Sequence, residues 1–130
     1  MPIVLLVTLG LHMAGALFWL LTSLVLGFNN NPAASKVMFR AQMVAATVTV
    51  FAGGGLWSWL HPGAFGRPEI VLAIGAVLAI AAAGVQGALV GGSVRRLPDP
   101  AAEKKILLGQ RIASGLLVVT LALMLMAKHV

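Results

Sequence analysis

The chain contains no cysteine, so it cannot form a disulfide bond, a thiolate zinc site or an iron–sulfur cluster from its own residues. Among redox cofactors, this composition still permits heme bound through histidine. Only three of the 130 residues are Asp or Glu, and no Ser/His/Asp set, carboxylate pair or phosphate-binding loop is present. The sequence therefore offers no motif for hydrolysis or phosphate chemistry, and it leaves open whether the protein is an enzyme.

Charge is also scarce. Charged residues make up 9% of the chain and hydrophobic residues 60%, with a mean hydropathy of +1.01. A soluble domain carries about 25% charged residues, so this composition predicts an integral membrane protein. The net charge of +6 lies beside hydrophobic spans, where a positive-inside bias explains it. We therefore expect contact with the lipid bilayer and no binding to nucleic acid.

Four long apolar runs predict four transmembrane helices, at about 3–27, 36–60, 69–94 and 105–128. Each run is long enough to cross a hydrocarbon core of about 30 Å at 1.5 Å per residue. Turn-forming residues separate the runs, and Ser35 is placed to cap the second helix. The first run lacks a basic leader and is too long for a signal peptide. We predict one all-α transmembrane domain over 1–130, a four-helix up-down-up-down bundle.

Seven cations flank the first and third connections of this bundle, whereas only Arg67 and Lys128 lie on the other side. The seven are Lys36, Arg40, Arg95, Arg96, Lys104, Lys105 and Arg111. Short cytoplasmic loops are enriched in Lys and Arg. The bias therefore predicts both termini outside, which is periplasmic in a bacterial inner membrane.

His12 is the only ionisable side chain in the first apolar run. It shares one helical face with Gly15, Ala16 and Trp19. Ionisable groups at membrane depth usually have a partner or a function. Two interpretations remain open. His12 is an axial heme ligand, or it makes a hydrogen bond to a neighbouring backbone or hydroxyl group, for example that of Thr120 or Ser58.

A second ligand to the same iron is harder to find. His61 and His129 lie about ten residues from the level of His12, roughly 15 Å along a helix axis. A methionine, water, Glu69 or another subunit would have to complete the site. Alternatively, His12 and Glu69 together could hold a metal ion such as copper or zinc.

The third run is rich in small residues, and Gly87–Gly91 matches the GxxxG pattern of helix dimers. Gln86 is its one strongly polar residue, and we expect it to make an interhelical hydrogen bond. These features predict the alternative to a cofactor protein. The chain would then be a non-catalytic accessory or assembly subunit that packs against other membrane subunits, or a homodimer.

The sequence resembles the HemJ-type protoporphyrinogen oxidases and CopD-like copper-resistance proteins. The resemblance rests on Leu11-His12-Met13-Ala14-Gly15 followed by Trp19, Phe39-Arg40, Gly55-Leu56-Trp57, Arg95-Arg96 and Arg111. It implies a four-helix bundle that binds heme b, with His12 as ligand and with Trp19 and Arg40 as further cofactor-binding residues. The second heme ligand of that family, a lysine early in the third helix, has no counterpart, because residues 67–72 contain neither lysine nor histidine.

Overall fold

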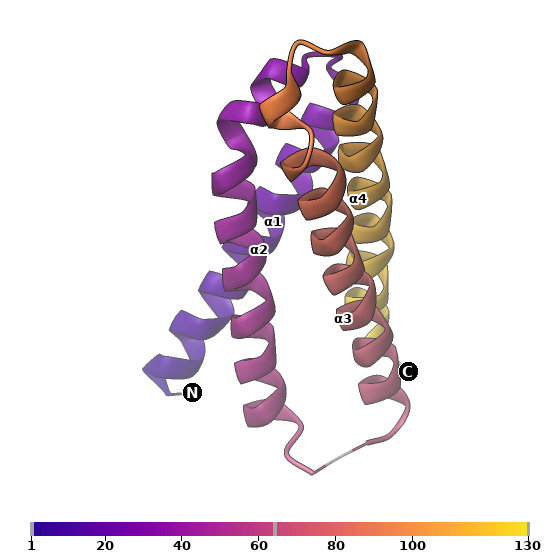
Figure 1. The fold of residues 1–130 in the computed structure, drawn as a ribbon. Helices are drawn as coiled ribbons and strands as arrows, with labels where there is room; N and C mark the ends of the chain where they lie inside the picture. The colour runs from indigo at the N-terminus through magenta and orange to yellow at the C-terminus, as the bar shows by residue number, and fades with distance from the viewer. Residues whose placement is uncertain (1, 64, 130) are drawn as a thin grey trace.

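The computed structural model describes residues 2–63 and 65–129, and all the regular structure in these ranges is helical. Four of the helices are long and apolar enough to cross a membrane, which confirms the predicted all-α fold (Figure 1). The elements are α1 (Ile3–Phe28), α2 (Pro32–Leu60), α3 (Arg67–Val85), the π-helix η1 (Gln86–Gly91), the 3-10 helix η2 (Val94–Arg96) and α4 (Pro100–Ala127).

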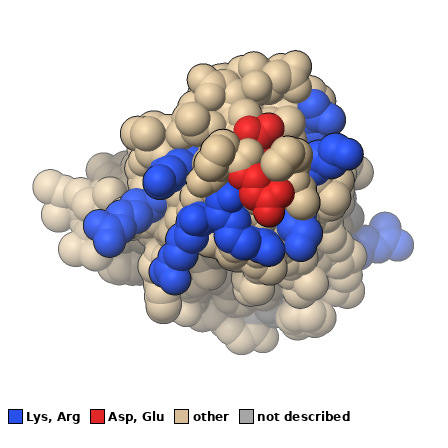
Figure 2. Space-filling view, turned by 45° about the horizontal axis from the view of Figure 1, so that its top comes forward, with Lys and Arg blue, Asp and Glu red and all other residues tan. Residues whose placement is uncertain are grey.

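Successive helices run in opposite directions, so both termini and the connection between α2 and α3 lie at one end of the bundle (Figure 1). We call this the terminal end. The connections between α1 and α2 and between η2 and α4 lie at the other end. The seven cations identified in the sequence lie on or beside these two connections, so we call it the basic end. Figure 2 shows Lys and Arg side chains surrounding a small acidic patch there.

The second and fourth helices begin four and five residues earlier than predicted. The second helix begins at Pro32 rather than at residue 36, because proline is well suited to the first turn of a helix. Ser35 is therefore not a cap but a buried residue inside α2. The fourth helix begins at Pro100, and the Asp99 side chain accepts a hydrogen bond from the Ala101 backbone N–H at 3.0 Å.

The third helix does not continue as one α-helix to residue 94. It changes to a π-helix at Gln86 and ends in a 3-10 turn. The two glycines of the GxxxG match have different surroundings. A Cβ on Gly87 would meet nothing within 4 Å, whereas one on Gly91 would lie 2.7 Å from the Phe39 ring. Gly91 is therefore packed inside the monomer, and the two glycines do not form one outward face.

The core is built mainly from small side chains, while many large ones point outward. A buried cluster contains Trp19, Leu20, Ala45, Ala46, Ala79, Ala82, Ala113 and Leu117. Outside it, Ile3 is 75% exposed, Phe51 is 77% exposed and Val77 is 65% exposed. Small residues let helices approach closely within a bilayer, and the large apolar side chains on the outside are suited to contact with lipid.

Candidate functional site

His12 is fixed against the backbone of α2. Its Nδ1 lies 2.8 Å from the backbone carbonyl oxygen of Thr49. Because a carbonyl oxygen can only accept, Nδ1 carries the proton and donates it. In the neutral imidazole, Nε2 then carries a lone pair. His12 therefore makes a hydrogen bond to a backbone group, although the acceptor is neither of the two residues given as examples. The bond uses only Nδ1, so it is compatible with both interpretations of His12.

Those two residues use their hydroxyl groups elsewhere. Ser58 donates to the Gly54 carbonyl at 3.1 Å. Thr120 donates to the carbonyls of Leu116 at 2.8 Å and Gly75 at 3.3 Å. Both bonds of Thr120 lie within the α3–α4 pair, whereas His12 belongs to the α1–α2 pair.

Gly53 makes room for the His12 ring. A Cβ at Gly53 would lie 3.0 Å from Cε1 and 3.2 Å from Nδ1 of His12. One helical turn away, a Cβ at Gly15 would lie 2.7 Å from the Thr49 hydroxyl oxygen. Glycine on both helices therefore brings the two backbones close enough for the imidazole to reach a main-chain carbonyl.

Trp19 lies in the core, with no exposed surface. Its Nε1–H donates to the Gln86 side-chain oxygen at 2.5 Å. Gln86 in turn donates to the Ser23 hydroxyl at 2.7 Å and to the Gln110 side-chain oxygen at 2.9 Å. The predicted interhelical hydrogen bond of Gln86 is confirmed.

This polar network reaches every membrane-spanning segment. Gln110 donates to the Gln42 side-chain oxygen at 2.8 Å and to the Ser35 hydroxyl at 3.3 Å. All three glutamine side chains are completely buried. The sequence contained a signal for Gln42 and Gln110 that we did not use, since each is a lone amide in an apolar run. Their satisfied hydrogen bonds identify the network as a structural element.

Arg40 is exposed at the basic end. Thr49, the partner of His12, lies nine residues further along α2, about 13 Å in axial rise. Trp19 lies seven residues beyond His12 on α1, about 10 Å in axial rise. The three residues predicted to bind a cofactor therefore occupy three different levels of the bundle.

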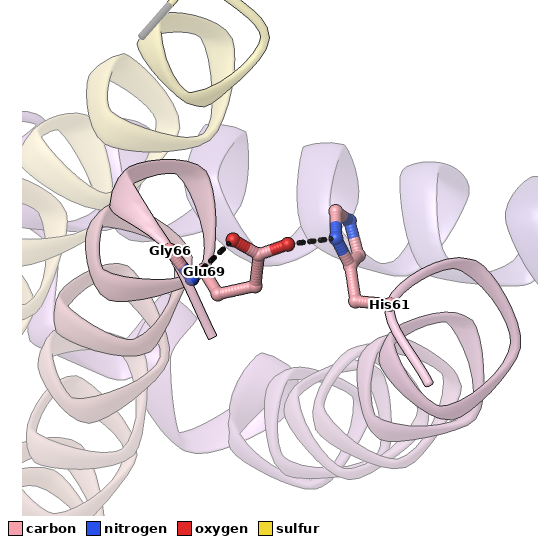
Figure 3. A network of polar contacts seen from close by, with 3 residues as sticks. All are labelled: His61, Gly66 and Glu69. Carbon is pink, nitrogen blue, oxygen red and sulfur yellow. Dashed lines mark hydrogen bonds and ion pairs between the residues drawn. The ribbon is translucent and has the colours of Figure 1, made fainter. Parts of the chain in front are cut away.

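Glu69 is held by His61 rather than by His12 (Figure 3). One carboxylate oxygen lies 2.8 Å from His61 Nδ1, and the other accepts the Gly66 backbone N–H at 2.9 Å. The Trp57 ring lies 5.9 Å from the imidazole, centroid to centroid. The sequence offered a signal for this pair that we did not use, since its members lie only eight positions apart along the chain.

The residues that the structure describes contain no cluster of three or more His, Asp or Glu side chains able to hold a metal ion. They show no contact between His12 and Glu69. A donor set of one imidazole nitrogen fits a single axial position on a heme iron. It does not fit a zinc or copper site built by this chain alone, which needs three or four ligands.

Two shallow hollows on the described surface are lined almost entirely by apolar side chains, and neither includes His12. One, of about 330 Å³, lies along α3 and includes Phe65. The other, of about 220 Å³, lies between α1 and α2.

Comparison with known proteins adds no assignment, because no family model, curated protein or solved structure matches the chain.

Proposed function

We propose that this integral membrane protein binds heme b through the Nε2 atom of His12. The observation that carries the proposal is the 2.8 Å hydrogen bond from Nδ1 to the Thr49 carbonyl. Histidines that ligate metals usually donate their other ring N–H to a carbonyl or carboxylate, which fixes the tautomer and the ring orientation. His12 has this arrangement inside an otherwise apolar segment.

The chain's own residues prepare the ligand. Thr49 accepts the Nδ1 proton, and Gly53 lets the ring lie against α2. A bound heme would supply one-electron redox chemistry. The resemblance to HemJ-type and CopD-like proteins remains a prediction, as does the part of Arg40.

The test is an absorbance spectrum of the detergent-purified protein, oxidised and reduced with dithionite, after expression with heme available. We expect a Soret band in the wild type and its loss in His12→Ala. The matched controls are His61→Ala and His129→Ala, which remove histidines at the terminal end and should keep the band. A colourless wild type without metal by elemental analysis would contradict the proposal.

A non-catalytic accessory subunit is the second candidate, and the outward face of α3 favours it. Val77 and Ile74 are 65% and 50% exposed and line the larger apolar hollow. About two turns beyond Val77, a Cβ at Gly84 would meet nothing within 4 Å. A second helix could pack closely on such a face.

The absence of cysteine makes this candidate easy to test. We expect Gly84→Cys to form a disulfide-linked dimer in native membranes if two copies pack through α3, whereas Gly10→Cys on α1 should remain monomeric. If the partner is another protein, a colourless complex of defined composition should persist through purification, and Gly84→Trp should dissociate it.

We propose that the basic end faces the cytoplasm and that both termini face outward, in a bacterial inner membrane. Seven cations against two support this orientation. Lys105→Cys should be protected from a membrane-impermeant maleimide in intact spheroplasts, whereas His129→Cys should react. The reverse pattern would overturn the orientation.

A further inference from the structure

The outward face of α4 combines fixed positive charge with an apolar surface. Lys104, Leu108 and Arg111 are spaced i, i+4 and i+7, so they share one side of the helix. All three are exposed, Leu108 by 51%. Further into the span, a Cβ at Gly115 would meet nothing within 4 Å, and Val118 is 47% exposed. Cations thus lie at the basic end of an uncovered apolar stripe.

Arg111 is held in place rather than extended freely. Its Nε donates to the Gly27 carbonyl at 2.7 Å, and Nη2 lies 3.4 Å from the Asn30 side-chain oxygen. The guanidinium carbon lies 5.4 Å from the centroid of the Phe28 ring, within range of a cation–π contact. A guanidinium has five N–H donors. Two are used here, so three remain for a ligand.

The charge at this end is not neutralised by the chain. Among residues 2–63 and 65–129, the one ion pair within 4.0 Å joins His61 and Glu69 at the terminal end. The basic end carries two carboxylates, Asp99 and Glu103, against seven cations. Asp99 accepts the Ala101 backbone N–H. The described part of the chain therefore leaves the Arg111 and Lys104 charges to be balanced by an external anion.

We propose that this face is a binding site for an anionic glycerophospholipid. The headgroup phosphate binds the open N–H donors of Arg111, with Lys104 about 10 Å further along the axis. An acyl chain lies along Leu108, Gly115 and Val118. A planar guanidinium recognises phosphate in two-point contacts, and the apolar stripe selects an amphiphile over a soluble anion. This inference does not depend on a cofactor at His12.

The test is native mass spectrometry of the delipidated protein in detergent. The lipid probes are phosphatidylglycerol and phosphatidylcholine with identical acyl chains. We expect the wild type to bind phosphatidylglycerol at least fivefold more tightly. The preference should fall below twofold in Arg111→Gln and Lys104→Gln. Arg67→Gln, which removes a cation at the terminal end, should keep it.

Arg111 also bonds to α1, so its loss can weaken the fold. The Lys104→Gln variant then decides, since the Lys104 side chain is exposed and makes no ion pair within the described residues. The proposal would be overturned if every variant kept the wild-type preference for phosphatidylglycerol. It would also be overturned if the wild type bound the two lipids equally. Competition by millimolar glycerol phosphate would assign the site to soluble phosphates instead.

Discussion

Gly53 leaves open the space in which the His12 ring lies. The ring of His12 occupies the space that a side chain at position 53 would need. The neighbouring Gly54 has nothing within 4 Å of its Cβ position. Two adjacent glycines of the same helix therefore have different roles, and substitution can distinguish them.

We expect Gly53→Ala to destabilise the protein by about 1–2 kcal/mol, as overpacking of a close contact usually does. The cost should disappear when His12→Ala is present, because the colliding ring is gone. Thermal unfolding in detergent measures both. Gly54→Ala is the matched control and should be neutral or stabilising. An equal cost of Gly53→Ala in the two backgrounds would mean that the ring does not set the requirement.

Gln86 connects Trp19, Ser23 and Gln110, so its removal leaves several buried groups without partners. Hydrogen bonds in membrane proteins average about 0.6 kcal/mol each, so Gln86→Leu should cost about 2 kcal/mol. The check is the unfolding free energy in a Trp57→Phe, Trp59→Phe background. In that background Trp19 is the only tryptophan, so fluorescence reports on it alone. Its emission should change when Gln86, the acceptor of its Nε1–H, is removed. An unchanged stability would show that the side chains find other partners.

At the scale of the element, the change from α3 to η1 keeps one side of the segment inward. Ala82, Gln86 and Val90 are all buried and follow one another at intervals of four residues. In an ideal α-helix each such step drifts by about 40°, so Val90 would turn away from the core. The wider π turn corrects the drift. π segments of this kind arise where an extra residue is accommodated within a helix.

The start of α4 depends on Asp99, whose carboxylate accepts the Ala101 N–H. Replacing an N-cap aspartate by alanine costs about 1 kcal/mol. Asp99→Ala should therefore fray the first turn of α4, and hydrogen exchange at residues 101–103 should accelerate about fivefold. Asp99→Asn is the conservative control and should retain most of the protection. If exchange in Asp99→Ala stays at the wild-type rate, the Asp99 cap does not stabilise the first turn of α4.

At the scale of the whole molecule, the sequence predicted the four spans and their alternation because a bilayer leaves few other solutions. Backbone groups in lipid must be bonded within the segment, so long apolar runs become helices. The pairing of helices was not predictable, since small residues occur on all four. The partner of His12 was also hidden, because it is a main-chain carbonyl that any residue would provide. The three-glutamine network combines residues from separate helices, and their proximity follows only from the folded arrangement.

The position of the glutamine network has a consequence for how the molecule moves. Its side chains join all four helices in the half nearer the basic end. In the other half, the contact of His12 lies within the α1–α2 pair, and that of Gly75 lies within the α3–α4 pair. Thermal fluctuations should therefore be uneven along the membrane normal. The half nearer the basic end should act as a hinge about which the two helix pairs move. The His61–Glu69 ion pair, which joins the end of α2 to α3, should limit their separation at the terminal end.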